Sequence, residues 1–239
     1  MELLAYAIIG GILYGIFFSL IGIGLNLIFG VMRIINLAHG QFIVLGGYAA
    51  WIISRHFGFN PLWGVPLSIV CAAVVGYPLY YAVVPRLQRS SDPEMLSFIL
   101  FFGIGQMLEA LTGLAFGADQ RSLPGEALAT GISVNRVSVI AFVAGLALAG
   151  TAGVFLPYLL GSVSPDLGNE LTTTSFAIVI IGSLGNPLGT VIGGLVFGLG
   201  TMLMQTYYSS WSNLVPYVLL LIIVLIRPTG LLGKTVRNA

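Results

Sequence analysis

The sequence predicts an all-α protein, a polytopic transmembrane helical bundle with broken helices and an internal structural repeat. Composition is the first observation behind this prediction. Hydrophobic residues make up 57% of the 239 residues, charged residues only 7%, and the mean hydropathy is +1.02. An ordinary soluble domain carries roughly 25% charged residues. The second observation is that the apolar runs between the charges repeatedly reach about 20 residues, the length of one membrane crossing.

The composition also excludes several classes of function. A net charge of +1 does not suit a nucleic-acid partner, which binds strongly basic surfaces. Cys71 is the single cysteine, so the chain has neither a disulfide framework nor a cysteine-based metal site. The sequence shows no nucleophile–base pair, metal cluster or carboxylate dyad at helical spacing, so we do not expect an enzyme.

Five apolar runs are long enough to cross the membrane. The first lacks the basic segment of a cleavable signal and is expected to remain as a span. Small residues recur four apart in the first run, at Gly11 and Gly15, and in the fifth, at Gly145, Ala149 and Gly153. Such steps let helices approach closely. The expected spans are residues 4–30, 37–56, 62–84, 95–116 and 137–160.

The last third of the chain is less regular. Its short apolar run ends in a glycine-rich segment and cannot cross the membrane alone. The helix that follows contains Gly194 and Gly198, another small-residue step. The expected order is a loop at residues 161–175, the short run at 176–181, a helix at 190–204 and a last span at 214–226.

Polar residues and glycines break the apolar pattern at two places, named here the first interruption (residues 36–47) and the second interruption (residues 182–189). Lipid offers no hydrogen-bond partner, so such a segment is tolerated at membrane depth only where protein or a water-filled cavity covers it. We therefore expect both to line a transport pathway. The expected pathway-lining residues are Asn36, His39, Gly40, Gln41, Gly46, Gly47, Gly182, Ser183, Gly185 and Gly189.

Each of these assignments has a structural alternative. Asn36 and His39 either line the pathway, where a helix N-terminus meets a solute carboxylate, or tie a helix bend. The glycines either border the pathway or only permit close packing. Residues 43–46 (Ile-Val-Leu-Gly) resemble residues 179–182 (Val-Ile-Ile-Gly), which suggests matching broken segments in two halves of the chain.

Glu109 lies inside the fourth apolar run, with Gln106 one turn before it. An acid within a membrane span indicates a functional role by default. Glu109 is, however, only about two turns from the end of the run. We therefore favour a structural, hydrogen-bonded role for this side chain.

The positions of Lys and Arg predict which loops lie on the inner side of the membrane, as far along the chain as Gly125. Lys and Arg in short loops stay on the inner side, which places the loop at residues 85–94 inside. Residues 119–121 then lie outside. Arg136 would lie outside too, unless a further crossing exists between Gly125 and Glu126. The side of the C-terminal tail stays open, because the chain before it crosses once or twice.

Several motifs together are specific to one family. They resemble those of the LivH/LivM-type permeases, the membrane subunits of ABC importers for branched-chain amino acids and related small solutes. The likeness covers both ends and most of the chain. The motifs are Gly30-Val-Met-Arg33-Ile-Ile-Asn36-Leu-Ala-His39-Gly40-Gln41-Phe-Ile-Val-Leu-Gly46-Gly47-Tyr48, Ala149-Gly-Thr-Ala-Gly153-Val, Ser164-Pro-Asp166, Phe176-Ala-Ile-Val-Ile-Ile-Gly182-Ser-Leu-Gly185-Asn-Pro-Leu-Gly189 and Arg227-Pro-Thr-Gly230-Leu-Leu-Gly233.

The resemblance implies a multi-pass permease subunit of the bacterial inner (plasma) membrane. It implies as partners a second permease subunit, two cytoplasmic ATPase subunits and an external solute-binding protein. The chain has no Gly-x-x-x-x-Gly-Lys-Ser/Thr motif, so no cofactor is expected in it and the partner subunits would bind ATP. From physics alone, a channel or secondary carrier for a small neutral solute such as urea or short amides stays open.

The chain departs from the family pattern between Gly125 and Glu126. Family members have another span there, followed by a cytoplasmic coupling element, and only the end of that element is recognisable here. We expect that about 50 residues are missing, a span of about 20 with its loops and coupling helix. By resemblance, the residues that contact the ATPase are Glu126, Ala127, Leu128, Ala129, Thr130, Gly131 and Ile132.

Overall fold

The computed structural model describes residues 2–117, 119, 121 and 137–233, and the regular elements within these residues are helices. A single antiparallel bridge, between Arg121 and Val163, is the β-type pairing found in this part of the chain. The all-α prediction is therefore confirmed. The expected coupling residues and the junction between Gly125 and Glu126 lie outside the described residues.

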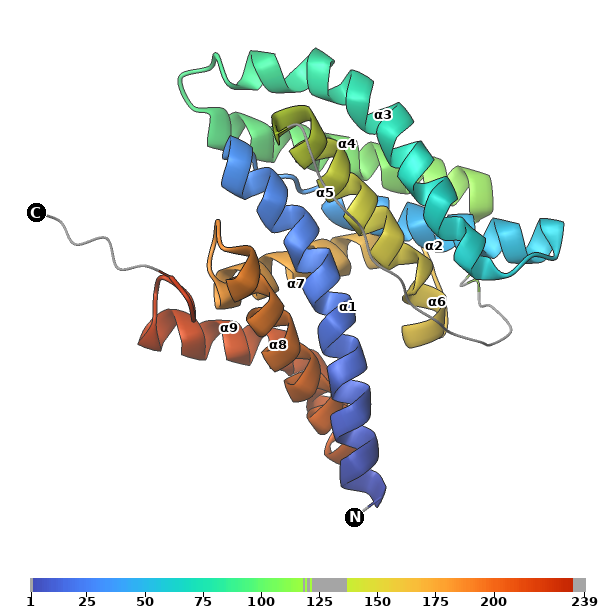
Figure 1. The fold of residues 1–239 in the computed structure, drawn as a ribbon, viewed down its shortest axis with the longest axis vertical. Coiled ribbons are helices and arrows are strands. Elements are labelled where there is room, and N and C mark those ends of the chain that lie inside the picture. The colour runs from blue at the N-terminus through green and yellow to red at the C-terminus, as the bar shows by residue number, and fades with distance from the viewer. Residues whose placement is uncertain (1, 118, 120, 122–136, 234–239) are drawn as a thin grey trace, which may run out of the picture. The chain divides into compact units, whose positions relative to one another are not determined.

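The chain divides into two compact units. Unit 1 comprises Met1–Asn26 and Thr173–Ala239, and unit 2 comprises Leu27–Thr172. The first helix, α1 (Glu2–Met32), and the helix α7 (Leu167–Gly182) each contribute residues to both units. The two units are described separately below, with the elements labelled as in Figure 1.

Unit 2 is organised around α5, which packs against both α2 and α3 (Figure 1). Small residues permit the contact with α2, because a Cβ at Gly46 would overlap the Gly150 carbonyl and one at Gly153 would overlap the Ile43 carbonyl. The predicted packing role of the small-residue stripe is thus confirmed at Gly153. The elements are α2 (His39–Phe57), η1 (Pro61–Trp63), α3 (Gly64–Leu87), α4 (Pro93–Phe116), α5 (Val137–Val154) and α6 (Leu156–Leu159).

Unit 1 is built on a close contact between α1 and α8 (Pro187–Tyr207). A Cβ at Gly198 would overlap the backbone of Gly15, and a Cβ at Gly15 would lie 2.8 Å from the Cα of Leu195. The two small-residue steps predicted from the sequence therefore face each other, as expected for helices that pack through their backbones. After α8 the chain continues through η2 (Ser209–Leu214) and α9 (Val215–Ile226).

Among the described residues, four helical stretches are long and apolar enough to cross a membrane, judged by length and composition. They are Glu2–Met32, Pro61–Leu87, Pro93–Phe116 and Pro187–Tyr207. They correspond to the expected first, third and fourth spans and to the helix that follows the second interruption. The expected second span forms α2, which is a helix of 19 residues but is not among the four.

Two sequence-based assignments are wrong in detail. Residues 161–175 were expected to be a loop, but α7 begins at Leu167. Its first turns are polar, which hides them from a search for apolar runs, and they are held by contacts such as that of the Thr172 hydroxyl with the Gly168 carbonyl at 2.8 Å. The fifth run is not one helix to residue 160, because α5 ends at Val154 and the short α6 follows.

Candidate functional site

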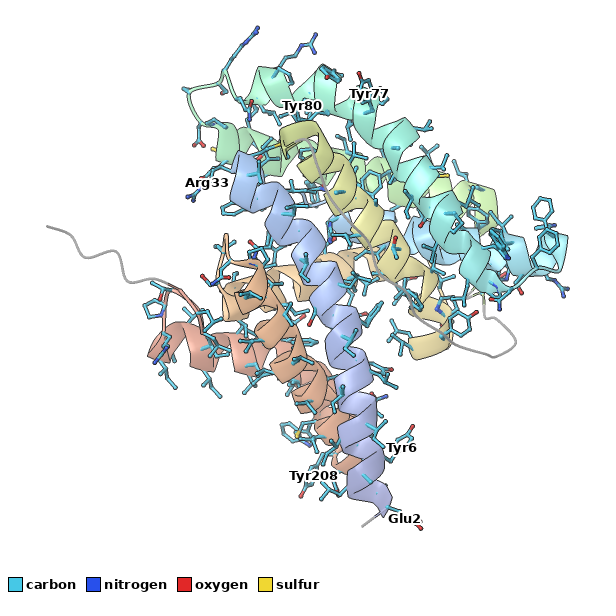
Figure 2. All side chains as sticks on the ribbon, in the orientation of Figure 1. Glu2, Tyr6, Arg33, Tyr77, Tyr80 and Tyr208 are labelled. Atoms are coloured by element: carbon cyan, nitrogen blue, oxygen red, sulfur yellow. The ribbon has the colours of Figure 1, made fainter. Side chains whose placement is uncertain are left out.

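The helix-free part of the first interruption runs beside α4. The chain leaves α1 at Arg33, which has a φ of 55° and is labelled in Figure 2, and becomes helical again at His39. Three contacts follow one another along α4: the Ile35 N–H donates to the Ser97 hydroxyl at 3.0 Å, a Cβ at Gly105 would lie 3.5 Å from Ala38, and Gln41 Nε2 donates to Glu109 at 3.2 Å.

The positions of these contacts along α4 show how far along this helix each contacting residue lies. Ser97 and Glu109 are separated by about 18 Å of helix axis, and Gly105 is near the midpoint of this 24-residue helix. The helix-free segment therefore starts near the beginning of α4, at Ser97, and reaches its middle at Gly105, and α4 is long and apolar enough to span the membrane.

The first backbone N–H groups of α2 are already bonded. Their partners are a side-chain oxygen, two backbone carbonyls of the same turn and a threonine hydroxyl from α7. No spare donor is left at residues 38–41 for a solute carboxylate, in contrast to a helix N-terminus that binds anions. The bonds are Ala38 N to Asn36 Oδ1 (3.1 Å), His39 N to Asn36 O (3.3 Å), Gly40 N to Thr172 Oγ1 (2.9 Å) and Gln41 N to Ala38 O (3.0 Å).

The polar side chains of this segment are buried. Asn36 and His39 are fully buried, and Gln41 is 1% exposed. Within the described residues, the Nδ2 atom of Asn36 and the Oε1 atom of Gln41 have no hydrogen-bond partner. Buried polar atoms are nearly always bonded in native proteins. These two atoms leave bonding capacity that a water or a ligand can fill, as do other buried polar atoms such as the Thr151 hydroxyl.

The Glu109 carboxylate accepts hydrogen bonds from side-chain amides on three helices, α2, α4 and α7. Its Oε2 atom accepts hydrogen bonds from Asn169 Nδ2 (2.9 Å), Gln41 Nε2 (3.2 Å) and Gln106 Nε2 (3.5 Å). The hydrogen-bonded state predicted for Glu109 is thus confirmed. Gln41 and Asn169 were not linked to it from the sequence, because Asn169 was assigned to a loop and nothing in the sequence places the start of α2 against α4.

The glycines of the first interruption do not break α2. Gly46 and Gly47 lie inside the helix, and their contacts with α5 and with Val163 account for the absence of side chains. Gly46 also borders an apolar cavity of about 310 Å³ that is lined mainly by α2, α3 and α5. Tyr48, in the wall of this cavity, stacks on Phe116 with ring centroids 4.1 Å apart.

The helix-free part of the second interruption, residues 183–186, is clamped by Asn26 of α1. The Asn26 amide donates to the Ser183 carbonyl (3.3 Å) and the Thr190 hydroxyl (2.5 Å), and its oxygen accepts from the Gly185 N–H (2.6 Å). Ser183 and Gly185 have positive φ values of 131° and 80°. Sequence reasoning missed Asn26, although a lone amide within a long apolar run is a visible signal.

The C-terminal motif, residues 227–233, forms hydrogen bonds with the end of α7 in unit 1. The Leu231 N–H donates to the Ile181 carbonyl at 2.8 Å, and the Leu232 N–H donates to the Gly182 carbonyl at 3.2 Å. These bonds satisfy carbonyls at the end of α7, which a helix end otherwise leaves free. A cavity of about 620 Å³ lies beside this motif, lined by Ile180, Ser183, Leu184, Gly185, Asn186, Pro228, Thr229, Leu232 and Gly233.

The structure places the expected pathway residues in two groups. Asn36, His39, Gly40 and Gln41 lie together at the start of α2, with Gly46 and Gly47 two turns further along this helix in unit 2. Gly182, Ser183, Gly185 and Gly189 lie together in unit 1, where the backbones of Gly182 and Gly189 are in direct contact. The matching sequences at residues 43–46 and 179–182 occupy different places, because Gly46 is inside α2 and Gly182 ends α7.

Comparison with known proteins identifies the family. The family of the branched-chain amino acid transport system permease component matches residues 7–128 and 124–224. The high-affinity branched-chain amino acid transport system permease protein LivH of Escherichia coli (strain K12) is 24% identical over 290 residues, covering 94% of each chain. BraD of Pseudomonas aeruginosa, with the same description, is 25% identical over 292 residues, covering 95% of each chain.

A second type of relative is more distant. The permease protein LivM of Escherichia coli (strain K12) is 21% identical over 291 residues, covering 91% of this chain and 68% of the relative. No solved structure matches the chain significantly. The family match extends over most of the chain and includes both interruptions. The chain therefore belongs to the permease components of branched-chain amino acid transport systems, a family of multi-pass membrane proteins.

Proposed function

We propose that this chain carries branched-chain or other small neutral amino acids across the bacterial inner membrane as the permease subunit of an ABC importer. The match to the permease family along both ends of the chain is the observation that supports this proposal. The importer would contain a second permease subunit, two cytoplasmic ATPase subunits and an external binding protein. Without a phosphate-binding motif of its own, the chain depends on the partner ATPases for energy.

The proposed route includes the first interruption. Its support is the position of residues 36–41 beside the middle of α4 and the spare buried atoms of Asn36 and Gln41. His39 and Gly40 belong to the same turn, and Gly46 and Gly47 follow on the same helix. The second interruption, with Gly182, Ser183, Gly185 and Gly189, is proposed to line the route as well.

We further propose that α2 acts as a half-helix and that the start of α8, although α8 is long enough to span, acts in the same way. Each begins directly after a helix-free segment, at His39 and at Pro187. Because both units contain such a helix, an internal structural repeat is retained as a proposal, although the matching four-residue sequences no longer support it. In this scheme, ATP binding and hydrolysis in the partners would rock the half-helices and alternate the access.

We also propose that the native polypeptide contains about 50 further residues between Gly125 and Glu126, including one span. The family matches in two stretches that meet at residues 124–128. The alignment with LivH extends over 290 residues, more than the whole of this 239-residue chain, so the relative has residues without a counterpart here. Residues 126–132 would then face the cytoplasm and contact an ATPase.

The proposal is tested by reconstituting the chain in liposomes with the ATPase subunits and binding protein encoded beside it. We expect leucine, isoleucine or valine uptake that requires ATP, the ATPase and the binding protein together. Uptake without ATP would indicate a channel or carrier. ATP-driven uptake of a different solute, with no branched-chain amino acid transported, would leave the importer class standing and overturn the substrate assignment.

A further inference from the structure

We infer that Glu109 and Gln41 form a subsite for the ammonium group of the transported amino acid. This inference rests on the proposed function, because it assumes an amino-acid solute. Two observations carry it. Glu109 is a carboxylate within an apolar helix and has only neutral amides as partners, and the Gln41 amide beside it has a buried oxygen with no donor.

The charge of Glu109 is not neutralised within the described part of the chain. Three amide groups donate to its Oε2 atom, and no basic side chain forms an ion pair with it there. Amides stabilise a carboxylate by hydrogen bonding but leave its charge in place. A carboxylate without a basic partner attracts a cation that visits this position.

The Gln41 amide has a fixed orientation. Its Nε2 atom donates to two acceptors, Glu109 Oε2 at 3.2 Å and the Pro165 carbonyl at 3.4 Å. The reversed amide would place its oxygen against both of these acceptors, so the contacts decide the assignment. The Oε1 atom is consequently left as an acceptor without a donor, in a side chain that is 1% exposed.

An ammonium group supplies what the two residues lack. It carries a positive charge and three N–H donors and has no acceptor. One donor can bond the Glu109 carboxylate and another the Gln41 oxygen, which removes the unpaired charge and the unpaired acceptor together. A carboxylate ligand would do neither, and the bonded N–H groups at the start of α2 offer it no donor.

The two members of the subsite differ in accessibility, because the Gln41 oxygen is buried whereas the Glu109 carboxylate lies among accessible groups. Glu109 is half-buried, and Gln106 and Asn169, which bond it, are exposed. The first turn of α7 lies directly on the first turn of α2, because Gly40 and Gly168 have no side chains at the contact. A Cβ at Gly168 would overlap the Gln41 amide. The variant Gly168→Ala would therefore displace this amide without changing the residue at position 109.

The test compares initial rates of leucine uptake in the reconstituted complex. Glu109→Gln keeps the size of the side chain and removes its charge, so we expect uptake to fall at least tenfold, with an unchanged melting temperature and unchanged binding of the ATPase subunits. Glu94→Gln makes the same change at an exposed position in the first turn of α4 and should leave uptake unaltered. Gly168→Ala should also slow uptake.

The outcomes separate the inference from the proposed function. A wild-type complex that transports no amino acid would contradict the proposed function itself. Wild-type uptake in Glu109→Gln, with normal transport by the unmodified complex, would overturn the ammonium subsite alone. If Glu109→Gln does not assemble, Glu109→Asp decides, since it retains the charge. Assembly and at least partial uptake by Glu109→Asp support the subsite, whereas an assembled Glu109→Asp without uptake overturns it.

Discussion

Single buried polar residues fix the two interruptions. Asn26 satisfies a carbonyl, a hydroxyl and an N–H of unit 1, and Asn36 caps the turn that leads into α2. A helix-free segment leaves backbone groups without helical hydrogen bonds, and these side chains supply partners for some of them. We therefore expect the loss of Asn26 to lower the free energy of unfolding, and a change at the start of α2 to slow transport.

Asn26→Leu should destabilise unit 1. It removes all three bonds to the second interruption, and each buried group left without a partner costs about 1–3 kcal/mol. We expect the free energy of unfolding to fall by at least about 2 kcal/mol, measured by denaturation in detergent. Asn60→Ala removes an exposed cap at η1 and serves as the matched control. Equal effects of both changes would contradict the clamp assigned to Asn26.

His39→Leu should slow amino-acid uptake. His39 is fully buried at the start of α2, in the segment proposed to line the route. His56, the second histidine of the chain, is exposed at the other end of α2 and provides the control. We expect His39→Leu to reduce the initial rate at least several-fold and His56→Leu to have little effect. Similar rates for both variants would remove His39 from the pathway.

At the scale of elements, glycines set the distances between helices. Gly46→Ala would place a Cβ in the Gly150 carbonyl and force α2 away from α5, and overpacking of this kind costs about 1–3 kcal/mol. Gly103→Ala, in α4, meets no atom within 4 Å and should instead stabilise its helix by about 0.5–1 kcal/mol. Thermal unfolding of both variants measures the difference. A melting temperature that rises for Gly46→Ala would disprove the close contact.

At the scale of the whole molecule, the proposed coupling to an ATPase depends on the additional residues proposed between Gly125 and Glu126. We expect the protein isolated from its native membrane to be heavier than the 25.3 kDa of this sequence by about 50 residues, the length of a span with its loops and coupling helix. Intact-mass measurement tests this directly. A native mass of 25.3 kDa would show that the span is truly absent and would weaken the coupling assignment.

The sequence by itself determined the class, the family and the positions of most helices. Long apolar runs are local signals, so the helices at Glu2–Met32 and Pro93–Phe116 followed from composition. The polar first turns of α7 did not, because they lack an apolar pattern and are held in part by a contact with α2, the bond of the Gly40 N–H to the Thr172 hydroxyl. Which residues meet at Glu109 was likewise decided by the tertiary structure. Gln41 and Asn169 are far from Glu109 in sequence, and no local pattern records that three helices bring their amides to one carboxylate.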